Sequence, residues 1–121
     1  MLLDEPELHL LGNVLVPDLA GWRRARMPEM PEATAFELAP DWVCEVLSSS
    51  TAAVDRARKV PIYAAAGVSH VWLVDPVLRT VEALRREADS YRLLGTWHGE
   101  GTARIEPFDA IELELAALWS R

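Results

Sequence analysis

The sequence contains a single cysteine, Cys44, so no disulfide within the chain can stabilise its fold. Small secreted domains usually depend on several disulfides, and a lone cysteine in an apolar segment is typical of intracellular proteins. Long apolar runs are also absent, since none approaches the roughly 18 residues of a membrane-spanning helix. The first residues, 1–11, are acidic where a secretory signal peptide is basic. These absences predict a soluble, cytoplasmic protein with no membrane partner.

Excess positive charge is missing as well, because the formal net charge is −7. A chain this acidic does not hold nucleic acid through a broad basic surface. A local basic cluster beside a bound metal ion can still hold a phosphate group. Two other kinds of site are excluded by pattern: the three histidines stand singly, without zinc-ligand spacing, and no Gly-x-Ser-x-Gly element marks a serine nucleophile.

The 121 residues are enough for one domain, and half of them are hydrophobic. Within this domain, residues 42–47 form a short apolar run with one carboxylate, Glu45, in its middle. Its length and its valine and tryptophan content favour a strand. Alternation places Val43, Glu45 and Leu47 on one face of that strand. Both faces are mostly apolar, which is typical of a central strand covered on each side.

A helix is predicted over residues 52–66, because a helical apolar pattern ends there at Gly67. Three polar side chains, Asp55, Lys59 and Tyr63, recur at intervals of four residues in this helix. Residues at this spacing line one side of a helix. The sequence therefore predicts that these three side chains lie together on one side of the helix.

The remaining segments predict further strands. Residues 14–22 read as one strand, in which Pro17 indicates an edge position or a bulge. Residues 71–74 follow the helix as a second core strand, and residues 80–86 and 91–97 alternate as antiparallel strands. The tail is expected to end as a short helix. The fold class is thus α/β (α+β): a mixed β-sheet with a central helix packed on it and a C-terminal antiparallel meander, in a single domain over residues 1–121.

A charge inside an apolar strand is costly unless it is paired, so Glu45 requires a partner. Asp18 follows Pro17 in the neighbouring predicted strand, and two such carboxylates can converge on one hard divalent cation. Mg²⁺ prefers oxygen ligands and often uses one or two carboxylates together with a substrate phosphate. Lys59 on the following helix can offset negative charge as a phosphate reacts.

Two segments carry a resemblance to a known family: PDLAGWRRAR, and then PDWVCEVLSSSTAAVDRARKVPIYAAAGVSHVWLVDP. Their order of strand, serine block, helix, glycine and strand resembles the Uma-two family of restriction-endonuclease-like proteins, which belongs to the PD-(D/E)XK nuclease superfamily. The resemblance implies a restriction-endonuclease-like fold and a metal-dependent endonuclease that hydrolyses phosphodiester bonds in DNA, with Mg²⁺ or Mn²⁺ as cofactor. It also implies Asp18 and Glu45 as metal ligands. Leu47 stands where the simple superfamily pattern has a lysine, and the family pattern on the helix makes Lys59 the catalytic lysine instead.

Supporting residues and an assembly are predicted as well. Asp55 and Tyr63 are expected to support the helix face around Lys59, and Arg23, Arg24 and Arg56 are weaker candidates for phosphate binding. Family members usually carry a longer segment before the first strand, so this chain is expected to be an N-terminally short domain. An unpaired sheet edge left by that difference favours a homodimer.

Plainer interpretations of the same residues remain open. Asp18 can be a strand-end residue, Glu45 can pair with Arg56, and Lys59 can pair with Asp55 one helical turn away. The arginines after Trp22 can be a solvated loop, and Asp41 offers a second Pro-Asp pair. The alternative function is a catalytically inactive homodimer or interaction module with a nuclease fold, and a weaker one is phosphate or nucleotide binding without cleavage.

Overall fold

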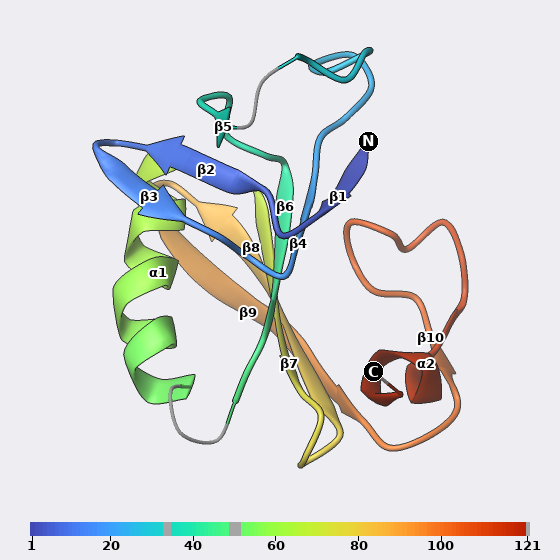
Figure 1. Cartoon of the computed structure of the whole chain (residues 1–121). Helices are drawn as coiled ribbons and strands as arrows, with labels where there is room; N and C mark the ends of the chain where they lie inside the picture. Colours follow the sequence, from blue (N-terminus) through green and yellow to red (C-terminus); the bar gives the residue numbers. More distant parts are fainter. Residues whose placement is uncertain (33–34, 49–51, 121) are drawn as a thin grey trace.

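The structure is a computed structural model, which describes residues 1–32, 35–48 and 52–120, except for the side chains of Ala52 and Asp55. A six-stranded sheet runs through its centre (Figure 1). The strands lie in the order β1-β4-β6-β7-β8-β9. Their bounds are β1 Leu2–Asp4, β4 Leu19–Gly21, β6 Trp42–Val46, β7 His70–Asp75, β8 Thr80–Glu87 and β9 Ser90–His98.

The centre of the sheet is a strand–helix–strand unit. Strands β6 and β7 are parallel, and helix α1, Ala52–Ala66, connects them. The other neighbouring pairs of this sheet are antiparallel. The mixed sheet, the central helix and the later antiparallel strands confirm the fold class predicted from the sequence.

One prediction about the strands was wrong. Residues 14–22 do not form one strand, because Val16, Pro17 and Asp18 separate β3, Asn13–Leu15, from β4. The buried ring of Pro17 has no N–H to donate to a ladder. Strand β3 instead joins a small second sheet, in which β2, Glu7–Leu10, lies between β3 and β5, Ala35–Phe36.

A tight turn connects β2 to β3. Its two residues, Leu11 and Gly12, both have positive φ angles, of 52° and 77°. Such angles are typical of the type I′ turn that suits the twist of a two-residue hairpin. The hairpin places buried Leu8 and Leu15 against the same face of the sheet as α1.

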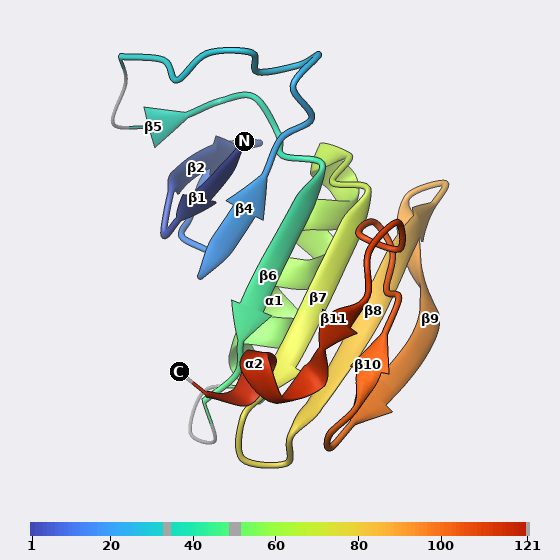
Figure 2. The same cartoon turned by 90° about the vertical axis from the view of Figure 1, so that its right-hand side faces the viewer.

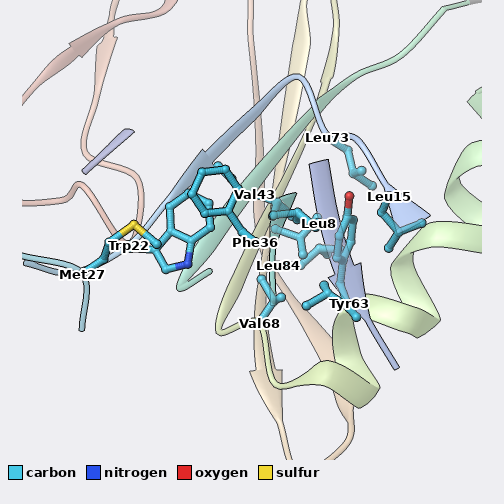
Figure 3. Packing of buried hydrophobic residues seen from close by; sticks show 13 residues of the cluster. Leu8, Leu15, Trp22, Met27, Phe36, Val43, Tyr63, Val68, Leu73 and Leu84 are labelled. Carbon is cyan, nitrogen blue, oxygen red and sulfur yellow. The ribbon is translucent and has the colours of Figure 1, made fainter. Parts of the chain in front are cut away.

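The two faces of the sheet carry separate cores. Figure 2 shows α1 behind the sheet, with β10, β11 and α2 in front of it. On the α1 side, Val43, Tyr63, Val71 and Leu73 pack with the β2–β3 hairpin, and Figure 3 shows part of this cluster. The opposite face is covered by the C-terminal segment, with β10 Thr102–Ala103, β11 Leu113–Glu114 and α2 Leu115–Trp119.

An aromatic cluster joins this C-terminal segment to the sheet. Trp42, Trp72 and Phe108 meet edge to face, with ring centroids 4.9–5.5 Å apart. The short terminal helix expected from the sequence is therefore present and docked. In the described part of the chain, neither helix has the length and apolar character to cross a membrane.

Candidate active site

Glu45 lies near the carboxyl end of β6, on the face that α1 covers. Its Cα partner on β7 is Leu73, and only 6 % of Glu45 is exposed. The alternation predicted for residues 42–47 is confirmed, because Val43 packs on the α1 side and Trp42 and Cys44 pack on the other. The carboxylate is thus enclosed in the core beside the end of a central strand.

Tyr63 holds this carboxylate from the helix. Its hydroxyl donates a hydrogen bond of 2.6 Å to Glu45 Oε1, and the side chain is fully buried. Figure 3 shows the hydroxyl oxygen directed toward the side of Leu15 and Leu73. A short hydrogen bond to an ionised group is one of the stronger polar contacts in a protein. Tyr63 therefore fixes one oxygen of Glu45 in place.

Lys59, one helical turn before Tyr63, supplies the opposite charge. Its Nζ lies 3.4 Å and 3.3 Å from the two carboxylate oxygens of Glu45. It also lies 3.5 Å from the main-chain oxygen of Val16. Three oxygens thus surround one ammonium group, whose side chain is 15 % exposed.

Asp18, the residue directly before β4, lies at the same end of β6 as Glu45. Leu19 pairs with Cys44 in the antiparallel register of β4 and β6. Continuing this register by one residue brings Asp18 opposite Glu45. Opposite residues of an antiparallel pair point to the same face, with Cβ atoms about 5 Å apart. Asp18 Oδ2 accepts a 2.6 Å hydrogen bond from the main-chain N–H of Val46. Asp18 therefore lies beside the end of β6, close enough for its charge to act on Glu45.

Burial governs the electrostatics of the site. It raises the pKa of Glu45 above the ordinary value, and the charge of Asp18 adds to the increase. The hydrogen bond from Tyr63 and the charge of Lys59 lower the same pKa. Burial and the neighbouring Glu45 also raise the pKa of Tyr63, so its hydroxyl remains a donor. An additional cation beside Glu45 would favour the ionised carboxylate.

The oxygens fit a hard divalent cation. A cationic ammonium group already lies among Glu45 Oε1, Glu45 Oε2 and the Val16 oxygen, which shows that this group of oxygens accommodates positive charge. Carboxylate and carbonyl oxygens are the ligands that Mg²⁺ and Mn²⁺ take. No group of three carboxylate, histidine or cysteine side chains that could hold a metal ion occurs within residues 1–32, 35–48 and 52–120. Glu45 and Asp18 would therefore share the ion with water or substrate.

The arginines predicted to bind phosphate weakly, Arg23 and Arg24, lie in a loop away from Glu45. Arg23 is bonded through its main-chain N–H to Asp41, which also pairs with Arg26. Asp41 lies directly before β6 and four residues from Glu45, which is roughly 13 Å at about 3.3 Å per strand residue. The structure therefore does not bring Arg23 and the neighbouring Arg24 to the carboxylates, and Asp41 organises a loop.

The alternative pairing of Glu45 with Arg56 is wrong. Arg56 forms two contacts, of 3.1 Å and 3.2 Å, with Glu82 on β8. Glu45 pairs with Lys59 and Tyr63 instead, because the helix turns those two side chains toward the sheet. The side chain of Asp55 lies outside the described part, so its predicted supporting role and its pairing with Lys59 stay predictions.

One feature of the site was not predicted from the sequence: the Val16 oxygen, which depends on the strand break before Asp18. Lys59 was predicted, and the sequence carries a further indication of it: Lys59 is the only lysine among the 12 lysine and arginine residues of the chain. Because lysine and arginine are not interchangeable at paired or buried sites, a lone lysine draws attention to this position.

Surface shape does not identify this site. A large hollow of about 740 Å³ lies between the loop around Arg26 and strand β5, and neither Glu45 nor Lys59 lines it. The hollow is mainly apolar, with Met27 and Phe36 in its wall. The converging polar groups at the end of β6 are therefore the stronger indication of chemistry.

Comparison with known proteins gives a family for this chain and a solved structure with a similar fold. Residues 4–117 match the model of the Uma2 family, described as "Putative restriction endonuclease". A search of curated proteins found no match. Among solved structures, the fold is similar to that of a protein from Anabaena variabilis described as a "putative nuclease belonging to DUF820", with a TM-score of 0.77 and 22 % identity. The similarity covers 98 % of this chain and 67 % of that one.

Proposed function

Because the chain belongs to the Uma2 family, described as "Putative restriction endonuclease", we propose that it hydrolyses phosphodiester bonds in DNA with the help of Mg²⁺ or Mn²⁺. The observation that carries the proposal is the buried carboxylate of Glu45, held by Tyr63 and Lys59 at a strand end beside Asp18. Buried ionisable groups of this kind, with specific charge partners, are characteristic of functional sites.

Each residue has a distinct role in the proposed reaction. A divalent ion, when bound, polarises a phosphoryl oxygen and lowers the pKa of a bound water. Glu45 and Asp18 hold the ion, and the hydrogen bonds from Tyr63 and from the Val46 N–H keep the two carboxylates oriented. Loss of a residue that orients a metal ligand typically lowers metal affinity or activity by about 10–100-fold.

Lys59 contributes positive charge where the reacting phosphate becomes more negative. Fixed charges aimed at developing charge are usually the largest contribution to such reactions. This role is important here because the whole chain carries a net charge of −7 and gives DNA no broad attraction. Attraction for the phosphate must therefore come from the site itself.

Cleavage of supercoiled plasmid with Mg²⁺ or Mn²⁺ tests the proposal. Glu45→Gln keeps the size of the side chain and removes its charge. We expect its cleavage rate to fall by more than about 100-fold, which exceeds the 10–100-fold effect typical of mutating a residue that only orients a metal ligand. Glu87→Gln is the matched control, because Glu87 pairs with arginines on the exposed end of β8. Equal cleavage by both variants would reject Glu45 as the metal ligand, and an RNA substrate in parallel tests the choice of DNA.

A second proposal concerns assembly. Strand β9 ends the main sheet and pairs only with β8 among the described strands. An edge strand of 9 residues presents unpaired main-chain groups to another strand. We propose that two copies pair through β9, as a nuclease homodimer or, if cleavage fails, as an inactive interaction module.

A further inference from the structure

We propose that Lys59 is an exchangeable internal cation: its ammonium group neutralises Glu45 in the ion-free protein and leaves Glu45 when a divalent ion binds. The inference rests on the proposed function, because it concerns the same metal site. It adds a step in which one lysine serves first the carboxylate and then the substrate phosphate.

The contacts of Glu45 divide into a tight one and loose ones. The hydrogen bond from the Tyr63 hydroxyl is 2.6 Å long. The Lys59 contacts, at 3.3 Å and 3.4 Å to Glu45 and 3.5 Å to Val16, all lie beyond the usual range for N–H···O bonds. Glu45 can therefore stay in place on Tyr63 while Lys59 moves away.

The charges make joint occupation unfavourable. A divalent ion that binds the Glu45 oxygens would lie next to the ammonium group, and like charges at such short distances repel strongly in a buried site. Glu45 would also lose its need for Lys59, since the ion supplies the compensating charge. Both effects favour departure of Lys59 from the carboxylate.

The residue type suits this movement. A lysine carries a compact charge on a flexible four-carbon stem, whereas an arginine fork is planar and favours a fixed two-point pairing. Lys59 is the only lysine of the chain. Its side chain is 15 % exposed while that of Glu45 is 7 % exposed, so the lysine is the more solvent-accessible of the two. When released from Glu45, its ammonium group would be available to a phosphate arriving from solvent.

The single lysine makes the exchange directly measurable. The unmodified chain offers two amines to an amine reagent: Lys59 Nζ and the N-terminus, which donates to the main-chain oxygen of Trp22. We would acetylate the protein briefly with and without saturating Mg²⁺ and quantify both sites by mass spectrometry. Isothermal titration calorimetry would measure Mg²⁺ binding separately, without any cleavage assay.

We expect Mg²⁺ to increase acetylation of Lys59 by about tenfold or more, with the N-terminal amine unchanged as the internal control. Glu45→Gln should abolish the Mg²⁺ effect, and Lys59→Gln should bind Mg²⁺ more tightly than wild type. If Mg²⁺ binds in the calorimeter while the reactivity of Lys59 stays constant, the exchange is overturned and the proposed nuclease function stands. If no divalent ion binds, both the exchange and the metal-dependent mechanism are overturned.

Discussion

Tyr63 is the residue on which the geometry of the site depends most directly. It is the only group at hydrogen-bonding distance below 3 Å from Glu45 among the described contacts. Removal of this donor leaves a buried carboxylate with the looser lysine contacts alone. The consequences should appear in activity, in pH dependence and in stability.

We predict that Tyr63→Phe lowers cleavage by about 10–100-fold, as expected for a residue that orients a metal ligand. The pKa of Glu45 should rise further, because the hydrogen bond from Tyr63 lowers it. The acidic limb of the pH–activity profile should therefore move to higher pH. Tyr91→Phe is the matched control, since the Tyr91 hydroxyl donates its 2.6 Å bond to the Val68 oxygen and not to Glu45. An unchanged acidic limb in Tyr63→Phe would show that Glu45 does not set that limb.

Lys59 gives a second prediction at the same scale. Lys59→Gln should lower cleavage by about 100-fold, which is typical of losing one fixed donor to a developing negative charge. Lys59→Arg keeps the charge but not the compact ammonium, so we expect it to restore only part of the loss. Single-turnover cleavage at saturating Mg²⁺ measures both variants. Full activity in Lys59→Gln would remove this residue from the mechanism.

Among the elements, the β2–β3 hairpin has a turn whose sequence conflicts with its conformation. Leu11 has a φ of 52°, which costs an ordinary residue about 1–2 kcal/mol, and its side chain is exposed. Asparagine tolerates this conformation and is preferred there in two-residue hairpins. The hairpin matters for the site because β3 leads directly to Val16 and Asp18, which lie beside Lys59 and the end of β6.

We therefore expect Leu11→Asn to increase the free energy of unfolding by about 1 kcal/mol in urea. Leu78→Asn is a suitable comparison, because Leu78 is also exposed but lacks a positive φ. The free energy of unfolding of Leu78→Asn should stay within about 0.5 kcal/mol of the wild-type value. A gain of the same size in both variants would mean that surface polarity, and not the turn, produces the effect.

The β9 edge gives the prediction about assembly. Leu93 is half exposed on this strand, and Leu93→Lys would place like charges near each other in a β9–β9 pair. Light scattering after size-exclusion chromatography should find a dimer for wild type and a monomer for Leu93→Lys. Leu78→Lys, which changes an exposed leucine in the β7–β8 turn, should leave the dimer intact. A monomeric wild type at high concentration would contradict pairing through β9.

For the whole molecule, the raised pKa of Glu45 links stability to pH. Its pKa in the folded protein lies above the ordinary value of 4.5, so the unfolded chain releases this proton first as pH rises. The free energy of unfolding contributed by the protonated carboxyl is then lost as the pH rises from 4.5 through the raised pKa of Glu45. We predict that wild type loses stability relative to Glu45→Gln through this interval in metal-free urea titrations.

Mg²⁺ should reverse that loss, because it binds the ionised carboxylate. The expected gain is about 2.7 kcal/mol at a free Mg²⁺ concentration 100 times the dissociation constant. The gain should disappear below pH 4.5, where Glu45 is protonated in both states, and in Glu45→Gln at any pH. A Mg²⁺ effect of equal size in wild type and Glu45→Gln would locate the bound ion elsewhere.

Much of this molecule could be predicted from local patterns. Alternation around Glu45 gave the correct faces of β6, and the helical spacing gave the stripe that brings Lys59 and Tyr63 to it. The strand break at Pro17 and the partner of Arg56 could not be predicted, because both depend on which strands become neighbours. Register between distant segments is set by tertiary packing, which a local pattern does not contain.

The hydrogen bonds of the site also span long stretches of chain: 18 residues from Glu45 to Tyr63, 28 from Asp18 to Val46 and 43 from Val16 to Lys59. Contacts of this separation form only after costly loop closure. A nascent chain on the ribosome therefore cannot assemble the site while α1 is still being synthesised. The proposed activity would therefore be absent until α1 has been made and has packed on the sheet, and a newly made chain would be harmless to nucleic acid until then.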